Sequence, residues 1–219
     1  AIGALYNDDN GSSSGHVRVF KLPDITPPTI AVNSDVSSLK AGETATLTFT
    51  LSESSSNFTE ADINISGGSL SAFSGSGSSY SAIFTPDLGS NADGVISIDS
   101  SSFSDLAGNT NSDGSDLDNT LNLSIDTLAP SIALTSDITS LNAGDVANLS
   151  FSLSEPSTDF DASDISISGG SLSAFSGSGS SYTAIFTPTA DSATDALISV
   201  ANSKFTDRSG NFNVDGADS

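Results

Sequence analysis

Eight oxygen-bearing side chains fall into two sets of four with the same spacing, and their chemistry suits a hard cation. The two sets, which lie 102 residues apart, are Asp24, Glu53, Asp105 and Asn109, and Asp126, Glu155, Asp207 and Asn211. Calcium binds six to eight oxygen ligands from carboxylates, amides, backbone carbonyls and water. Three carboxylates that lie close together repel one another unless a cation sits between them. The pattern predicts one calcium site for each set, provided that folding brings its four members together.

The motif Asp105-Leu-Ala-Gly-Asn109 has a second interpretation that needs no metal. Asp and Asn tolerate turn geometry, and Gly108 supplies a positive φ, so the motif is also what an ordinary tight turn requires. A further candidate, Asn7-Asp-Asp-Asn-Gly11, has the acid-then-glycine pattern of a calcium loop but lacks its full spacing. We expect that segment to hold no metal.

The repeated spacing comes from a tandem duplication. Residues 24–117 align with residues 126–219 without a gap, and 54 of these 94 positions are identical. The stretch Gly67 to Tyr80 recurs unchanged at Gly169 to Tyr182. A repeat of this length is long enough to fold around its own core. We therefore expect two domains, unit 1 (residues 24–125) and unit 2 (residues 126–219), after an N-terminal segment of residues 1–23.

The units are predicted to be all-β. In Ala45-Thr-Leu-Thr-Phe-Thr-Leu51 apolar and polar residues alternate strictly, as they do in a half-buried strand. Similar patterns predict strands near Thr29–Asn33, Asp62–Ile65, Ser69–Phe73, Tyr80–Phe84, Val95–Ile98 and Thr120–Ile125. Seven short antiparallel strands in about 100 residues are typical of an immunoglobulin-like β-sandwich. In that topology the end of the second strand, the last loop and the entering linker meet at one pole, which brings the four oxygen donors of each unit together.

The two ends of the chain carry separate expectations. Residues 1–23 should form a β-hairpin, with Ile2 and Ala4 facing Val17 and Val19 across a loop at Asn7 to Ser14, before a stiff Pro-rich linker. The counterpart of strand Thr120–Ile125 falls beyond Ser219, so unit 2 is expected to lack its final strand. Either a continuation of the chain or segment His16–Leu22 of a neighbouring copy could fill the gap, the latter building a fibre.

The composition excludes several classes of function. A net charge of −22, from 27 acidic and five basic residues, makes nucleic acids and anionic membranes unsuitable partners. No apolar run approaches the roughly 18 residues of a membrane-spanning helix. The chain has no Cys, so no disulfide or thiol nucleophile can form. Its single histidine, His16, has no counterpart in either unit and cannot by itself supply a zinc site of several histidines, so a structural or exposed role is expected for it.

We therefore expect no enzyme. A hydrolase built on paired carboxylates would need acids that occur in one unit only, whereas these acids recur in both. The alternative is a module that binds a carbohydrate or a protein through exposed aromatic residues. The candidates are Tyr6 in the N-terminal loop and Phe212, which stands where unit 1 has Thr110.

Several motifs resemble a known family. They are Asp24-Ile-Thr-Pro-Pro-Thr-Ile30, Leu39-Lys-Ala-Gly-Glu-Thr-Ala45, Phe49-Thr-Leu-Ser-Glu53, Tyr80-Ser-Ala-Ile-Phe-Thr-Pro86 and Asp105-Leu-Ala-Gly-Asn109. They are similar to the bacterial Ig-like repeats of giant secreted adhesins, including RTX-type adhesins and biofilm-associated proteins. The resemblance implies an extended, calcium-stiffened stalk, extracellular or on a bacterial surface. Its partners would be neighbouring repeats, copies of itself, or a surface glycan or protein. Residues 1–22 resemble the end of an FG-GAP, integrin-α-like repeat.

Overall fold

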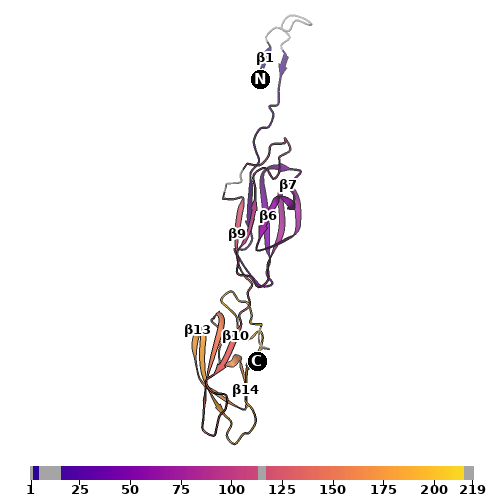
Figure 1. Cartoon of the computed structure of the whole chain (residues 1–219). Coiled ribbons are helices and arrows are strands. Elements are labelled where there is room, and N and C mark those ends of the chain that lie inside the picture. Colours follow the sequence, from indigo (N-terminus) through magenta and orange to yellow (C-terminus); the bar gives the residue numbers. More distant parts are fainter. Residues whose placement is uncertain (1, 5–15, 113–116, 215–219) are drawn as a thin grey trace.

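The chain forms two elongated β-sheet units joined end to end, with a small strand pair at the N-terminal end (Figure 1). The computed structural model describes residues 2–4, 16–112 and 117–214. The units coincide with the two halves of the duplication, and each has its own hydrophobic core.

Unit 1 is a sandwich of two β-sheets. One sheet has the strand order β3-β5-β7 and the other β4-β9-β8-β6. The strands are β3 (Ile30–Ser34), β4 (Ser38–Lys40), β5 (Ala45–Ser55), β6 (Ile63–Ser66), β7 (Gly68–Pro86), β8 (Gly94–Ile98) and β9 (Thr120–Asp126), with one 3₁₀ turn, η1 (Glu60–Asp62). All the paired strands run antiparallel except β4 and β9, which pair in parallel. The predicted sandwich is confirmed.

Strand β7 folds back on itself as a hairpin, which explains the stretch that occurs twice in the sequence. The backbone N–H of Asp87 donates to the carbonyl of Gly67, and the hydroxyls of Ser74 and Ser81 lie 3.4 Å apart. The turn between the two arms contains Gly75, whose φ of 136° suits glycine alone. An added Cβ at this position would lie 2.3 Å from a backbone carbonyl oxygen.

The core of unit 1 follows from the alternation of its strands. Along β5 the buried positions are Ala45, Leu47, Phe49 and Leu51, while the threonines between them face solvent. Phe58 lies among the aromatic rings, with its centroid 5.0 Å from that of Tyr80 and 5.2 Å from that of Phe103. From β9, Leu123 and Ile125 complete this core.

Unit 2 repeats most of this arrangement. Its strands are β10 (Ile132–Ser136), β11 (Ala147–Ser157), β12 (Ile165–Ser168), β13 (Gly170–Pro188) and β14 (Leu197–Val200), with a 3₁₀ turn, η2 (Ala162–Asp164). The described part of unit 2 contains no counterpart of β9. Residues 140–142, which align with β4, accordingly form no strand. Leu134 of β10 is 36% exposed, whereas its equivalent Val32 in unit 1 is 5% exposed. In unit 1 strand β9 contacts β3, and the described residues of unit 2 include no strand in that place.

The N-terminal hairpin is present, with a register different from the one expected. Strand β1 (Ile2–Ala4) pairs with β2 (His16–Arg18) so that Ile2 lies opposite Arg18 and Gly3 opposite Val17. The expectation that Ile2 and Ala4 face Val17 and Val19 is therefore wrong by one residue. Alternation predicts which residues share a face, but the length of the connecting loop sets the pairing. That loop, with Tyr6 and the segment Asn7–Gly11, lies outside the described residues.

Candidate metal centre

The structure brings three of the four predicted donors of unit 1 together at its N-terminal pole. Carboxylate oxygens of Asp24, Glu53 and Asp105 all lie within 4.8 Å of one another. Asp24 comes from the entering linker, Glu53 from the end region of β5, and Asp105 from the loop between β8 and β9. We call this group the pole cluster. It has the residues that the sequence predicts, from three segments far apart in the chain.

The same geometry recurs where the two units meet. Oxygens of Asp126, Glu155 and Asp207 also lie within 4.8 Å of one another. Asp126 is the last residue of β9, so this junction cluster includes a residue from the connection between the units. The recurrence of one arrangement in both units indicates that the duplicated sequence encodes the cluster itself.

The acid of the last loop is held in place by its own turn. Both oxygens of Asp105 accept hydrogen bonds from Asn109, Oδ1 from its backbone N–H at 2.8 Å and Oδ2 from its amide nitrogen at 2.8 Å. Asp207 and Asn211 repeat these contacts at 2.9 Å. The motif is therefore both a tight turn and part of the acidic cluster, because the hydrogen bonds of the turn orient the carboxylate of Asp105 toward Asp24 and Glu53.

The two predicted asparagine donors lie beside the clusters but present their amide nitrogens to them. The nitrogen of Asn109 donates to Asp105 and, at 3.3 Å, to the backbone carbonyl of Asp24. The nitrogen of Asn211 donates to Asp207 and, at 3.0 Å, to the carbonyl of Asp126. An amide NH₂ group is a donor and does not bind a cation. In this arrangement the two asparagines orient the acids, and the carboxylates are the candidate ligands.

The electrostatics of each cluster centre on its glutamate. Desolvation, followed by the charges of Asp24 and Asp105, raises the pKa of Glu53. Desolvation, followed by the charges of Asp126 and Asp207, likewise raises the pKa of Glu155. Burial opposes ionisation of Asp105, but the hydrogen bonds from Asn109 outweigh it and lower the pKa of that carboxyl group. In both clusters, burial and the charges of the two aspartates therefore disfavour ionisation of the glutamate.

One oxygen of the junction cluster has no partner. Among the described residues, Oε1 of Glu155 is the buried side-chain oxygen that accepts no hydrogen bond. A buried carboxylate oxygen that lacks a partner is costly unless a donor or a cation satisfies it. The donor set of this cluster thus fits a cation that is bound by hard oxygens.

The junction cluster is covered by a loop of unit 1. At the end of β4 the chain turns through Lys40-Ala-Gly-Glu43, and the backbone N–H of Ala41 donates to Oδ1 of Asn211 at 2.9 Å. Nζ of Lys40 donates to the carbonyl of Gly210 at 3.5 Å. Asn211 is consequently 3% exposed, and its amide bridges the two units.

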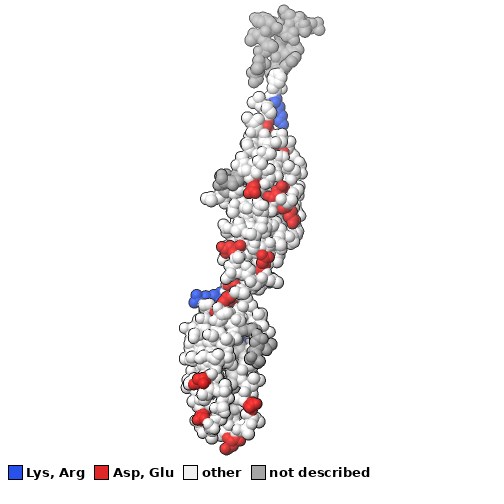
Figure 2. Space-filling model, viewed as in Figure 1, with Lys and Arg blue, Asp and Glu red and all other residues white. Residues whose placement is uncertain are grey.

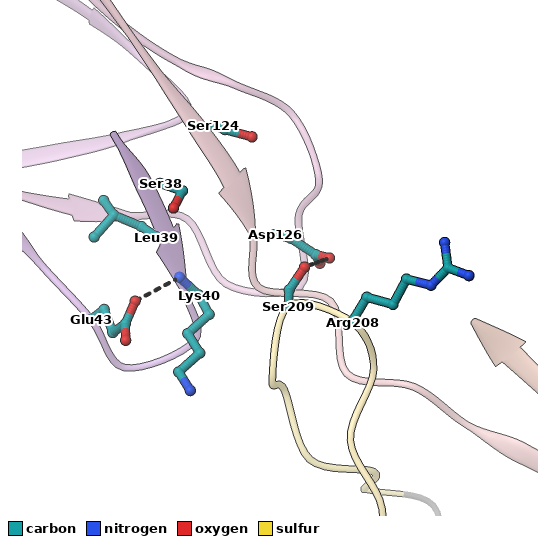
Figure 3. A pocket seen from close by; sticks show the side chains of 8 residues that line it. All are labelled: Ser38, Leu39, Lys40, Glu43, Ser124, Asp126, Arg208 and Ser209. Carbon is teal, nitrogen blue, oxygen red and sulfur yellow. Dashed lines mark hydrogen bonds between the residues drawn. The ribbon is translucent and has the colours of Figure 1, made fainter. Parts of the chain in front are cut away.

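Figure 3 shows the same junction from the side of a shallow pocket of about 420 Å³. The hydroxyl of Ser209 donates to Oδ2 of Asp126 at 2.6 Å, and the side chain of Arg208 points away from Asp126. Acidic side chains are spread over both units on the face seen in Figure 2, and a basic group projects at the waist between them. This face, on a chain with a net charge of −22, therefore favours cations.

Sequence reasoning missed the docking role of Ala41 and the contact of Ser209. The recurrence of Leu39-Lys-Ala-Gly-Glu43 as Leu141-Asn-Ala-Gly-Asp145 was the available signal. It marks a loop that is retained in both units, but not what the loop touches.

Comparison with protein families identifies the family of the two units. A family model described as Bacterial Ig-like domain matches residues 24–124 and again residues 126–219. The chain belongs to this family. The two matches coincide with unit 1 and unit 2, and the FG-GAP resemblance of residues 1–22 remains a prediction.

Comparison with solved structures places the chain beside FdeC, described as a broadly conserved Escherichia coli adhesin. The two have 16% sequence identity and a TM-score of 0.42, and the match covers 93% of this chain and 66% of the other. No curated protein sequence matches the chain. None of the helices in the described residues has the length and apolarity needed to cross a membrane.

Proposed function

We propose that the chain is a non-enzymatic, calcium-stiffened spacer segment of a bacterial adhesin or cell-surface fibre, and that it works outside the cell. The junction cluster carries this proposal. Asp126 lies at the connection between the units, Asp207 belongs to unit 2, and Asn211 is held by the loop of unit 1. A cation bound there would link the chain connection to the body of unit 2 and limit bending at the waist.

The residues present fit calcium better than smaller or softer metals. Three carboxylates and nearby backbone carbonyls supply hard oxygens, and no Cys or second His exists to favour zinc. Magnesium demands a near-ideal octahedron and retains its water, which suits a loop-built site less well. The Ig-like family and the acidic surface agree with an extracellular role, where calcium is plentiful and disulfides are the alternative means of stabilisation.

Chelation tests the proposal directly. A cation that binds only the folded chain stabilises it by about 2.7 kcal/mol at a free concentration of 100 times Kd. We expect calcium to raise the Tm and isothermal titration to give two sites per chain. Small-angle scattering should show a narrower distribution of maximum dimensions with calcium than with chelator. Melting and scattering curves that do not change on chelation would falsify the proposal.

A second function, the binding of a glycan or a protein, has one observation in its favour. Phe212 is 57% exposed at the junction end of unit 2, where unit 1 has Thr110. Exposed aromatic side chains are common anchors in recognition sites. Binding to a glycan array that disappears in Phe212→Ala, with an unchanged Tm, would support this function over the spacer.

Assembly into a fibre by strand donation is also open to test. Unit 2 has a groove of about 640 Å³ lined by residues such as Leu141, Leu149 and Phe186. The N-terminal segment offers Val19, Phe20 and Leu22, all more than two-thirds exposed. A strand from a neighbouring copy could pair with β14 there. Polymers formed by residues 1–219 but not by a chain beginning at Asp24 would establish this mode.

A further inference from the structure

The contact between the two units uses two surfaces, and each surface occurs a second time in the chain. The first is the turn of unit 1, whose Ala41 N–H donates to Asn211. The second is the loop end of unit 2 that presents Oδ1 of Asn211. Because the units are duplicates, unit 2 has a turn of the same kind, with Asn142 in place of Lys40, and unit 1 has a loop end with the same Asp, Gly and Asn.

The free turn of unit 2 has the shape of the engaged turn. In unit 1 the N–H of Glu43 donates to the carbonyl of Lys40 at 3.2 Å, and Glu43 caps the N–H of Lys40 at 3.1 Å. In unit 2 the equivalent contacts of Asp145 with Asn142 measure 3.1 Å and 2.8 Å. The third residue of each turn is a glycine with positive φ, 82° for Gly42 and 89° for Gly144. Both are turns of type II geometry, so docking needs no rearrangement of the free one.

The free loop end of unit 1 also matches its engaged counterpart. Asn109 is oriented by Asp105 and Asp24, as Asn211 is by Asp207 and Asp126. Within the described residues nothing donates to Oδ1 of Asn109, and nothing accepts from the N–H of Ala143. Asn109 is more exposed than Asn211, which is 3% exposed under the turn of unit 1.

We propose that these two ends form a docking interface between chains: the turn Asn142–Asp145 of one copy binds the loop end of unit 1 in a second copy. Ala143 N–H donates to Oδ1 of Asn109, as Ala41 N–H does to Asn211. Since the two surfaces differ and lie at opposite ends, the contact is head to tail and does not close, so it adds copies in a line. The partner is another Ig-like unit with the same turn, and this interface does not depend on the cation proposed above.

The interface is small, so association between separate chains is weak. Inside the chain the same contact is favoured by the covalent connection, which gives an effective concentration on the order of millimolar. Sedimentation velocity of residues 1–219 from about 10 µM to about 1 mM covers the range in which the contact forms in trans. We expect the weight-average sedimentation coefficient to rise with concentration, both in calcium and in chelator.

Ala143→Pro is the sharpest variant. Proline suits the second position of a type II turn, so the turn persists while the one donating N–H is removed. We expect Ala143→Pro to weaken association about fivefold, the loss typical of one hydrogen bond. Ala41→Pro is the matched control, because it removes the equivalent donor at the internal junction and leaves association in trans intact. Asn109→Ala, checked for folding by circular dichroism, should act as Ala143→Pro does.

Three results would overturn the proposal. The first is a sedimentation coefficient that stays constant up to the highest concentration. The second is association that Ala143→Pro and Asn109→Ala leave unchanged, which would assign the contact to another surface. The third is association that is insensitive to Ala143→Pro but lost when the chain begins at Asp24, which would establish strand donation instead. Because each arm is repeated with chelator, failure of docking is distinct from failure of calcium binding.

Discussion

The pole cluster and the junction cluster contain the same residue types in the same geometry, yet only one of them is covered. At the junction the turn of unit 1 lies on Asn211, and Oε1 of Glu155 is buried without a partner. At the pole Asn109 and Asp24 remain accessible to solvent. The duplicated sequence therefore supplies two equal sites, and the contact with a neighbouring unit makes them differ.

This difference indicates what a neighbour contributes. The turn of unit 1 adds no carboxylate to the cluster, but it covers Asn211, the asparagine that orients Asp207. Electrostatic interactions strengthen when water is removed. We accordingly expect the junction cluster to bind calcium more tightly than the pole cluster, and the following variants contrast the two units, beginning with the largest effect.

Removal of the central aromatic ring of either core should cost about 3–5 kcal/mol in the unit that carries the change. We expect Phe58→Ala to destabilise unit 1 and Phe160→Ala to destabilise unit 2, since each ring packs only within its own core. Hydrogen exchange followed by mass spectrometry assigns the loss to a unit. If Phe160→Ala exposed both units equally, the two cores would not be independent.

Removal of the aspartate that each cluster takes from its linker should distinguish the roles of the two clusters. Asp126→Ala and Asp24→Ala are each expected to eliminate one calcium site in isothermal titration, with a loss of about 2.7 kcal/mol of calcium-dependent stability at 100 times Kd. Only Asp126→Ala should widen the scattering distribution in calcium, because only its cluster spans the connection between the units. A wider distribution in Asp24→Ala as well would remove the structural distinction between the sites.

Replacement of the junction glutamate should have opposite effects with and without calcium. A raised pKa means that the folded state favours the protonated Glu155, so in chelator stability falls as pH rises through the usual range of a glutamate and above it. Glu155→Gln should therefore raise the Tm in chelator at pH 7 and flatten this dependence. In calcium it removes a ligand and should weaken binding about tenfold, or about 1.4 kcal/mol. Glu53→Gln is the matched variant at the pole. There too we expect a higher Tm in chelator and weaker calcium binding.

The smallest effect should come from Ala41→Pro. It removes the one hydrogen bond from Ala41 to Asn211, about 1 kcal/mol, and preserves the turn. We expect a modest widening of the scattering distribution without a change in the number of calcium sites. A junction that is as stiff in this variant as in the unaltered chain would show that the cation alone sets the angle.

The sequence predicted those strands in which apolar and polar residues alternate. It missed β4, a strand that depends on pairing with a segment far away in the sequence. Ala45 to Leu51 alternates strictly, and the structure buries these apolar residues as expected. The three residues of β4 carry no alternation long enough to detect. They form a strand because β9, some 80 residues later, pairs with them in parallel. Residues 140–142 of unit 2 form no strand, because the described residues of that unit include no counterpart of β9 to pair with them.

For the site, the sequence by itself determined the types of candidate ligand, their spacing and their duplication. The turn motif at Asp105 and Asp207 depends on local backbone preferences, and these are written in neighbouring residues. Only the tertiary structure decided that the asparagines donate hydrogen bonds to the acids, that the turn at Ala41 covers Asn211, and that Oε1 of Glu155 accepts no hydrogen bond. Those facts depend on which side chains and backbone groups meet across the sandwich and between the units. The spacing of residues along the chain specifies neither the direction of a side chain nor the presence of a neighbouring unit.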